Sequence, residues 1–153
     1  MKIKSGDSMS ANNGRYDVFV SHASKDKLKY VDNLVEAIKQ VGLTVFYDKE
    51  SIAWGDSIQE KVDEGIESCR LAVVVISKAY FDRTWTEYEL KSLLKRQNIE
   101  GRKIIMPILY GVRKKELVKH YPALSDILFK YSKQCSCDEM AKLLKKELTS
   151  HEC

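Results

Sequence analysis

The sequence predicts an α/β fold in which a parallel sheet of five strands is covered by helices on both faces. First, the run Leu71–Ile76 is apolar at every position, which is typical of a strand buried on both faces of a parallel sheet. Second, short apolar runs alternate along the chain with segments of about 10–17 residues that have helical periodicity. Third, 153 residues with 44% hydrophobic and 31% charged side chains suit one domain with a core of its own.

Five short apolar segments are predicted as strands, and the connections between them are long enough for crossover helices. Because such crossovers are right-handed, this series of units favours the strand order 2-1-3-4-5 of a flavodoxin-like fold. The segments, in chain order, are 16–20, 43–47, 71–76, 103–109 and 127–131.

Helices are predicted where apolar residues recur at spacings of three and four. Ser24 and Asp56 come at the start of two of these segments and are predicted as their N-caps. Leu28, Ile58 and Leu143 belong to the apolar stripes and are expected to face the core. The predicted helices are 25–41, 56–69, 85–101, one short helix within 111–125, and 138–148.

Composition argues against several classes of protein. The net charge of +4 is mild and basic residues are not interleaved with aromatic ones, so no nucleic-acid surface is predicted. No apolar run approaches the ~20 residues of a membrane span and no signal-peptide pattern opens the sequence, so a cytoplasmic protein without membrane contact is expected. Residues 1–14 are expected to be a disordered tail ahead of one domain, 15–150. Four cysteines are expected to be free thiols: Cys69, Cys135, Cys137 and Cys153.

The predicted strand order also predicts where a ligand binds. In open α/β sheets, ligands bind beyond the carboxyl ends of the strands, at the point where the strand order reverses. Here that point lies between the first and third strands and is flanked by two loops, 21–24 and 77–84. The helix at 85–101 follows the second loop directly, so its first turns are expected close to this crevice.

Glu87 and Glu89 both lie early in this helix but on different faces. At about 100° per residue, Glu87 shares a stripe with Lys91, so it is predicted to be an ordinary solvated acid. Glu89 has Trp85 one turn before it and Leu93 one turn after it, with no basic residue on that stripe. Such a carboxylate is either a rim residue that reaches water or, as its position near the crevice favours, a site residue.

Several enzyme and cofactor signatures are missing from the sequence. The first and third predicted strands are followed by Ser21 and Ser77, where a phosphoacceptor receiver would need an acidic residue. There is no glycine-rich dinucleotide or phosphate-binding loop, no zinc pattern and no nucleophile elbow. No metal or bound cofactor is therefore expected. His22 is expected to contact ligand or backbone rather than to act as a general base.

Three segments together resemble the Toll/interleukin-1 receptor (TIR) domain family, and most of all its bacterial, enzymatic branch. They are YDVFVSHASKD at 16–26, YDKESIAWGDSI at 47–58 and ISKAYFDRTWTEYEL at 76–90. The resemblance covers about residues 15–148 and implies a five-stranded parallel sheet surrounded by helices. Some members of the family are signalling adaptors, whereas others cleave NAD+ at the nicotinamide–ribose bond, using a glutamate that closes a W-x-x-x-E pattern.

In this sequence the W-x-x-x-E pattern begins at Trp85 and ends at Glu89. The resemblance therefore implies that Glu89 is the catalytic residue and that Trp85 walls its pocket. The indole of Trp54 is expected to stack on an adenine or to bury against a neighbouring subunit, with packing on its own helix as the alternative. The resemblance further implies that two loops frame the nucleotide, through Ser21, His22, Ala23, Asp48, Trp54 and Gly55.

The resemblance also implies partners and a biological setting. NAD+ is expected as substrate rather than as cofactor, with nicotinamide and either ADP-ribose or a cyclic ADP-ribose as products. Self-association through TIR–TIR contacts is expected, besides contacts with other TIR domains or a fused sensor domain, in immune or antiphage signalling. The loop at 51–55 lacks the proline of receptor-type members, and their C-terminal Phe-Trp box is missing. The alternative is a non-catalytic interaction module, either an adaptor or a host-mimicking effector.

Overall fold

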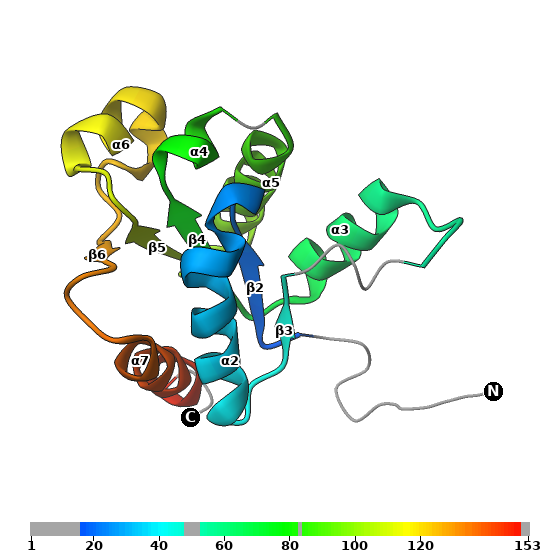
Figure 1. Ribbon diagram of the computed structural model, residues 1–153. Helices are drawn as coiled ribbons and strands as arrows, with labels where there is room; N and C mark the ends of the chain where they lie inside the picture. The colour runs from blue at the N-terminus through cyan, green and yellow to red at the C-terminus, as the bar shows by residue number, and fades with distance from the viewer. Residues whose placement is uncertain (1–15, 48–52, 83, 151–153) are drawn as a thin grey trace.

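The structure is a computed structural model that describes residues 16–47, 53–82 and 84–150, with residues 84–86 and 150 described by their backbone only. Its centre is a sheet of five parallel strands in the order β3-β2-β4-β5-β6. In chain order this is 2-1-3-4-5, so the predicted strand order is confirmed. Figure 1 shows the strands with helices around them. The tail predicted for 1–14 lies outside the described residues.

The strands agree with the predicted segments, although the outermost strands, β3 and β6, contain only two residues each. The strands are β2 (Val18–Ser21), β3 (Val45–Phe46), β4 (Leu71–Ile76), β5 (Ile105–Leu109) and β6 (Lys130–Tyr131). The helices are α2 (Asp32–Gln40), α3 (Ile58–Ser68), α4 (Lys78–Phe81), α5 (Thr84–Glu100), α6 (Lys114–His120) and α7 (Cys137–Ser150). Shorter turns are η1 (Ser24–Asp26), η2 (Lys27–Val31) and η4 (Pro122–Leu124).

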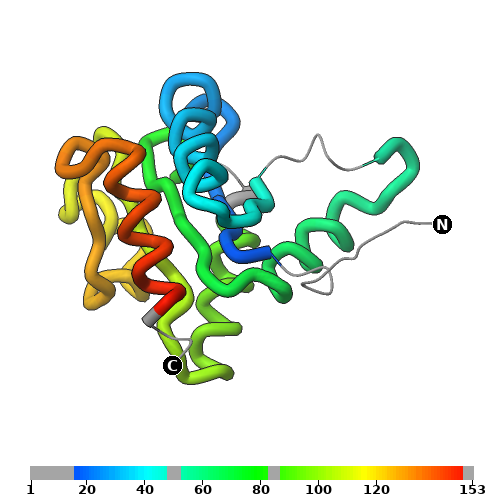
Figure 2. Tube along the Cα trace, turned by 90° about the horizontal axis from the view of Figure 1, so that it is seen from below, coloured from blue at the N-terminus to red at the C-terminus, as the bar shows by residue number. Residues whose placement is uncertain are grey.

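The central strand β4 is buried on both faces, as its apolar sequence predicts. Val74 and Ile76 belong to the core cluster that includes residues of α3 and α5. Val73 and Val75 belong to the second cluster, which includes residues of α2 and α7. Because successive side chains of a strand point to opposite faces of the sheet, β4 contributes residues to both core clusters. Figure 2 shows α2 and α7 together on one side of the sheet and α5 on the other.

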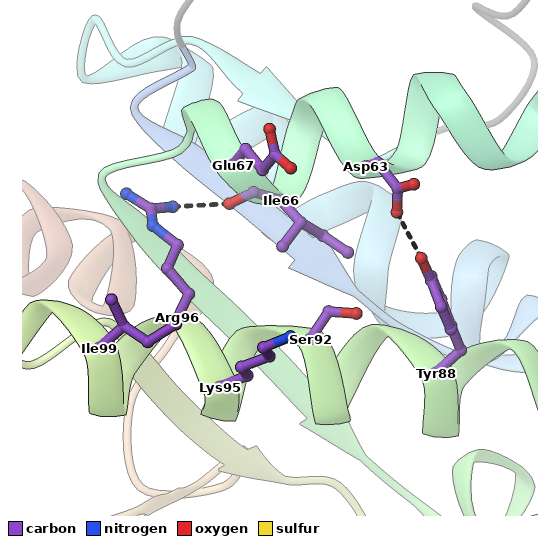
Figure 3. Close-up of a pocket in the computed structure, with 8 residues that line it drawn as sticks. All are labelled: Asp63, Ile66, Glu67, Tyr88, Ser92, Lys95, Arg96 and Ile99. Carbon is purple, nitrogen blue, oxygen red and sulfur yellow. Dashed lines mark hydrogen bonds between the residues drawn. The ribbon is translucent and has the colours of Figure 1, made fainter.

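Side-chain hydrogen bonds join α3 to α5 along a groove of about 340 Å³ (Figure 3). The Tyr88 hydroxyl donates to Asp63 Oδ1 at 2.6 Å, and this bond raises the pKa of Tyr88. Arg96 Nη1 donates to the backbone oxygen of Ile66, also at 2.6 Å. These bonds fix the rotation of α5 relative to α3, which decides which residues of α5 face the sheet.

A glycine allows α3 to approach the sheet closely. Gly65 is buried in α3, and a Cβ atom built on it would lie 2.9 Å from the ring of Phe46 and 3.2 Å from that of Phe19. The two phenylalanine rings are themselves stacked, with their centroids 5.5 Å apart. Any side chain at position 65 would therefore push α3 away from β2 and β3.

Periodicity placed three apolar residues wrongly: Leu28, Ile58 and Leu143 are 82%, 52% and 40% exposed. Leu28 lies in η2, a π turn, where the period of an α-helix does not hold. Ile58 is in the first turn of α3, which projects beyond the edge of the sheet in Figure 1. Leu143 lies beside a groove between α7 and β6, while Met140 and Leu144 take the inward positions of α7.

Both predicted N-caps are also wrong. Ser24 lies inside η1, and the residue before that turn is Ala23. Ser57 caps α3, because its hydroxyl accepts from the N–H of Glu60 at 3.3 Å. Asp56 instead accepts from the N–H of Ala53 at 3.0 Å, within the preceding turn.

The predicted state of the cysteines is confirmed for the three that the structure describes. Cys69, Cys135 and Cys137 are free thiols, and burial raises the pKa of Cys69 to about 11. Cys153 lies outside the described residues. Within the described ranges, no helix is both long and apolar enough to cross a membrane.

The substitution Gly65→Ala is expected to lower the free energy of unfolding by about 1–3 kcal/mol, because the new methyl group meets the stacked rings of Phe46 and Phe19. The intrinsic helix preference of alanine over glycine, about 1 kcal/mol, acts in the opposite direction. Urea denaturation measures the difference. The control is Glu64→Ala at the adjacent exposed position, where a change within about 0.5 kcal/mol is expected. A Gly65→Ala variant as stable as the control would contradict the close approach.

Candidate active site

Buried polar side chains gather at the carboxyl ends of β2 and β4. Ser21 ends β2 and is 1% exposed, and Ser77 follows β4 and is 4% exposed. Asp26 in η1 and Glu89 in α5 are 7% and 4% exposed. Buried polar groups cost free energy unless they are hydrogen-bonded, so four at one place require a reason. Their position is the one where open parallel sheets bind ligands.

The carboxylate of Glu89 is held by the end of β2. Ser21 Oγ donates a hydrogen bond to Glu89 Oε1 at 2.8 Å. The same Ser21 Oγ lies 2.8 Å from the hydroxyl oxygen of Tyr80, whose side chain is fully buried. Burial raises the pKa of Tyr80 well above its usual value, and the charge of Glu89 adds to the rise, so the phenol keeps its proton.

The short helix α4 begins at this site, inside the segment 77–84 that was predicted as a loop. Ser77 is its N-cap, because Ser77 Oγ accepts from the N–H of Tyr80 at 3.1 Å. Ser77 Oγ also donates to Asp26 Oδ2 at 2.5 Å. The ring of Tyr80 stands edge-on to that of Tyr121, with their centroids 6.1 Å apart. The start of α4 is therefore fixed against η1, and with it the position of Tyr80.

Glu87 and Glu89 lie on different faces of α5, as the helical geometry predicts. The side chain of Glu87 is 52% exposed and its Oε1 lies 3.1 Å from Lys91 Nζ. Glu89 is 4% exposed, so the alternative in which it is a rim residue reaching water is wrong. Of these two acids, Glu89 is the one whose carboxylate lies at the carboxyl end of β2, where Ser21 Oγ contacts it.

The loop after β2 carries two further predicted site residues, His22 and Ala23, which directly follow Ser21 in the sequence. His22 Nδ1 lies 3.2 Å from the backbone oxygen of Val20, so the predicted contact of His22 with the backbone is confirmed. Ala23 is fully buried, and its backbone oxygen accepts from the N–H of Asp26 at 3.0 Å. The loop is thus closed on itself directly beyond Ser21.

The structure does not bring the four other predicted site residues into contact with Glu89, or does not describe their side chains. Trp54 is fully exposed in the turn before α3, so the alternative in which it packs on its own helix is wrong. Gly55 in the same turn has a φ of +97°, which favours glycine. Asp48 lies outside the described residues, and Trp85 is placed in the first turn of α5 by its backbone only. Their roles in binding substrate stay predictions.

Asp26 and Tyr80 join the site although neither was predicted as a site residue. Each follows a strand end within a few residues, which is the signal that could have indicated them. The resulting arrangement is a buried carboxylate oriented by a hydroxyl group, which can accept hydrogen bonds from a sugar or stabilise a developing positive charge. In the described part of the chain, His, Cys, Asp and Glu side chains do not gather in threes that could hold a metal ion.

Comparison with known proteins identifies the family. The family model for the TIR domain matches residues 18–144. The 2′ cyclic ADP-D-ribose synthase BtTIR of Bacteroides thetaiotaomicron is 36% identical over 131 residues, which are 86% of this chain and 45% of that protein. The NAD(+) hydrolase TcpC of Escherichia coli is 33% identical over 133 residues, 87% of this chain and 43% of that protein. This chain therefore spans less than half the length of these two relatives.

Solved structures share the fold at lower identity. The TIR domains of the activated Roq1 resistosome superpose with a TM-score of 0.67 and 24% identity, over 88% of this chain and 98% of that one. The TIR domain of the Toll-related receptor TRR-2 from Hydra magnipapillata has a TM-score of 0.62 and 21% identity, over 89% and 97%. With the family model matching 18–144, the chain belongs to the TIR domain family.

Proposed function

We propose that this chain cleaves NAD+ at the nicotinamide–ribose bond, with Glu89 as the catalytic carboxylate. The observation that carries the proposal is the burial of Glu89, 4% exposed, at the carboxyl ends of β2 and β4, where Ser21 holds it at 2.8 Å. Relatives that are 33–36% identical and are named NAD(+) hydrolase or 2′ cyclic ADP-D-ribose synthase support the reaction class.

Glu89 acts by electrostatic stabilisation in this proposal. When the bond between ribose C1′ and nicotinamide breaks, its electron pair stays on the nicotinamide nitrogen and positive charge develops on the ribose. A carboxylate beside that ribose stabilises the oxocarbenium-like transition state and can accept hydrogen bonds from the ribose hydroxyls. Because nicotinamide leaves as a neutral molecule, no general acid is needed, and one carboxylate suffices where most glycosidases use two.

A nucleophile completes the reaction by bonding to C1′ and releasing a proton. Water gives ADP-ribose, whereas a group of the same molecule gives a cyclic ADP-ribose. His22 and Ala23 follow Ser21 in the loop after β2, and the resemblance assigns them to substrate binding. The exposed indole of Trp54 is available for stacking on the adenine or for contact with a second copy of the chain. The roles of Asp48, Gly55 and Trp85, and the setting in cytoplasmic immune or antiphage signalling, stay predictions of the resemblance.

We propose in addition that the chain self-associates through a groove of about 400 Å³ between β5, β6 and α7. Leu128 and Leu143 line this groove and are 88% and 40% exposed. The exposed lysines Lys130 and Lys146 line it as well, so its surroundings are apolar and positively charged. A groove that is apolar and lined by exposed lysines is suited to a partner surface that carries acidic residues.

The acidic surface of a second copy fits this groove. The helix α3 exposes Glu60 and Glu67, and Figure 1 shows α3 on the opposite side of the molecule from β6 and α7. Because the two surfaces differ, a contact between them is heterologous and extends from copy to copy. Association of this kind would make activity depend on protein concentration.

The substitution Glu89→Gln is expected to reduce the rate of nicotinamide release about 100-fold or more. The amide keeps an oxygen that accepts from Ser21 but has lost the negative charge. The measurement is incubation of concentrated protein with NAD+, followed by chromatography of nicotinamide, ADP-ribose and any cyclic product.

The matched control is Glu87→Gln, which removes only the exposed pair with Lys91 and is expected to leave activity unchanged. Full activity of Glu89→Gln would show that Glu89 is not the catalytic residue. A concentrated wild-type protein that releases no nicotinamide would instead favour the non-catalytic interaction module.

Reversing two charges of the groove, Lys130→Glu with Lys146→Glu, is expected to weaken self-association about tenfold, since each rim contact contributes up to about 1 kcal/mol. Sedimentation and the concentration dependence of the NAD+-cleaving rate measure the effect. Lys29→Glu, at an exposed lysine of η2, is the control. Adding Glu60→Lys and Glu67→Lys is expected to restore association, and a wild-type chain that stays monomeric at high concentration would refute the proposal.

A further inference from the structure

We propose that Ser21 and Tyr80 are positioning residues for Glu89, and that the Ser21 hydroxyl binds this carboxylate rather than the substrate. The inference rests on the NAD+-cleaving function proposed above and deepens it, because it names the groups that hold the reacting carboxylate. It differs from the resemblance, which implies a substrate contact for Ser21.

The direction of the hydrogen bonds follows from the number of protons. Ser21 has one hydroxyl proton, and it is donated to Glu89 Oε1 at 2.8 Å. The bond between Ser21 Oγ and the Tyr80 hydroxyl, also 2.8 Å long, must therefore be donated by Tyr80. The raised pKa of Tyr80 keeps this donor protonated at neutral and moderately alkaline pH. With Ser21 only 1% exposed, its hydroxyl is committed to protein partners at both ends.

Tyr80 is itself held at both ends. Its backbone N–H donates to Ser77 Oγ at 3.1 Å, and Ser77 donates to the buried carboxylate of Asp26. Its ring is fully buried, and its hydroxyl reaches Ser21. One continuous series of contacts thus runs from Asp26 in η1, through the first turn of α4 and the end of β2, to Glu89 in α5.

Such a series changes the carboxylate in two ways. Donation from Tyr80 polarises the Ser21 O–H bond, which strengthens the charge-assisted bond to Glu89. The bond also restricts rotation of the carboxylate, so less reorganisation is needed when positive charge develops on the ribose. Both effects act on the transition state through Glu89, so they are expected in kcat rather than in KM.

A double-mutant cycle on nicotinamide release tests the inference. Tyr80→Phe removes only the hydroxyl and is expected to lower kcat about 3–10-fold with KM nearly unchanged. Ser21→Ala removes the bond to the charged oxygen and is expected to lower kcat about 10–100-fold. In the double variant, kcat is expected to equal that of Ser21→Ala, because Tyr80 acts through Ser21. Ser21→Thr keeps a hydroxyl on a side chain suited to a strand and is expected to recover most of the loss.

Tyr121→Phe is the control, since its ring packs on Tyr80 within the same aromatic cluster, and its kcat is expected to stay unchanged. Thermal unfolding of each variant separates loss of the fold from loss of positioning. Equal losses from Tyr80→Phe in the wild-type and Ser21→Ala backgrounds would overturn the inference. A raised KM with unchanged kcat in Ser21→Ala would also overturn it, by showing a substrate contact. A wild-type protein that releases no nicotinamide would refute the proposed function itself.

Discussion

The hydrogen bond from Ser21 to Glu89 is the constraint on which the rest of the site depends. It joins the end of β2 to α5 across 68 positions of the sequence. A carboxylate that is 4% exposed has lost most of its hydration, and a hydrogen bond from a protein donor offsets part of that cost. The Ser21 hydroxyl therefore stabilises Glu89 in its buried position. The site therefore depends on the position of the end of β2 relative to α5, because Ser21 must lie within hydrogen-bond distance of Glu89.

The packing of the sheet and of α3 sets that relation. β2 and β4 pair in register, with Ser21 opposite Val74, so the end of β2 is fixed relative to the strand that leads into α4 and α5. The rotation of α5 is fixed from its other side, where Tyr88 donates to Asp63 of α3. Gly65 allows α3 to come close enough to the sheet for this contact. Contacts on the far side of α5 thus help to turn Glu89 inward.

Periodicity in the sequence predicts which way side chains point within an element, and it did so correctly for the central strand and for the two acids of α5. The separate faces of Glu87 and Glu89 follow from local spacing alone, whereas the strand order also required the rule that crossovers are right-handed. Leu28 was misplaced because its turn does not have the period of an α-helix, and Ile58 and Leu143 because a stripe does not indicate where the neighbouring element ends. Asp26 and Tyr80 lie 51 and 59 positions from their partners Ser77 and Ser21, and no local pattern specifies such pairs. What the sequence could not predict was therefore the tertiary contacts that hold the carboxylate.

In the proposed reaction, a neutral hydroxyl at position 21 suits the carboxylate of Glu89 better than a cation at that position would. An arginine in the place of Ser21 could satisfy the same oxygen, but its charge would offset the negative potential that a developing ribose cation requires. Ser21 is neutral, and burial keeps Tyr80 neutral by raising its pKa. Ser21 thus contacts the buried carboxylate directly, and Tyr80 supports it through Ser21, without either hydroxyl adding a positive charge. The same burial that makes Glu89 costly to fold makes its charge effective, because few water molecules remain to screen it.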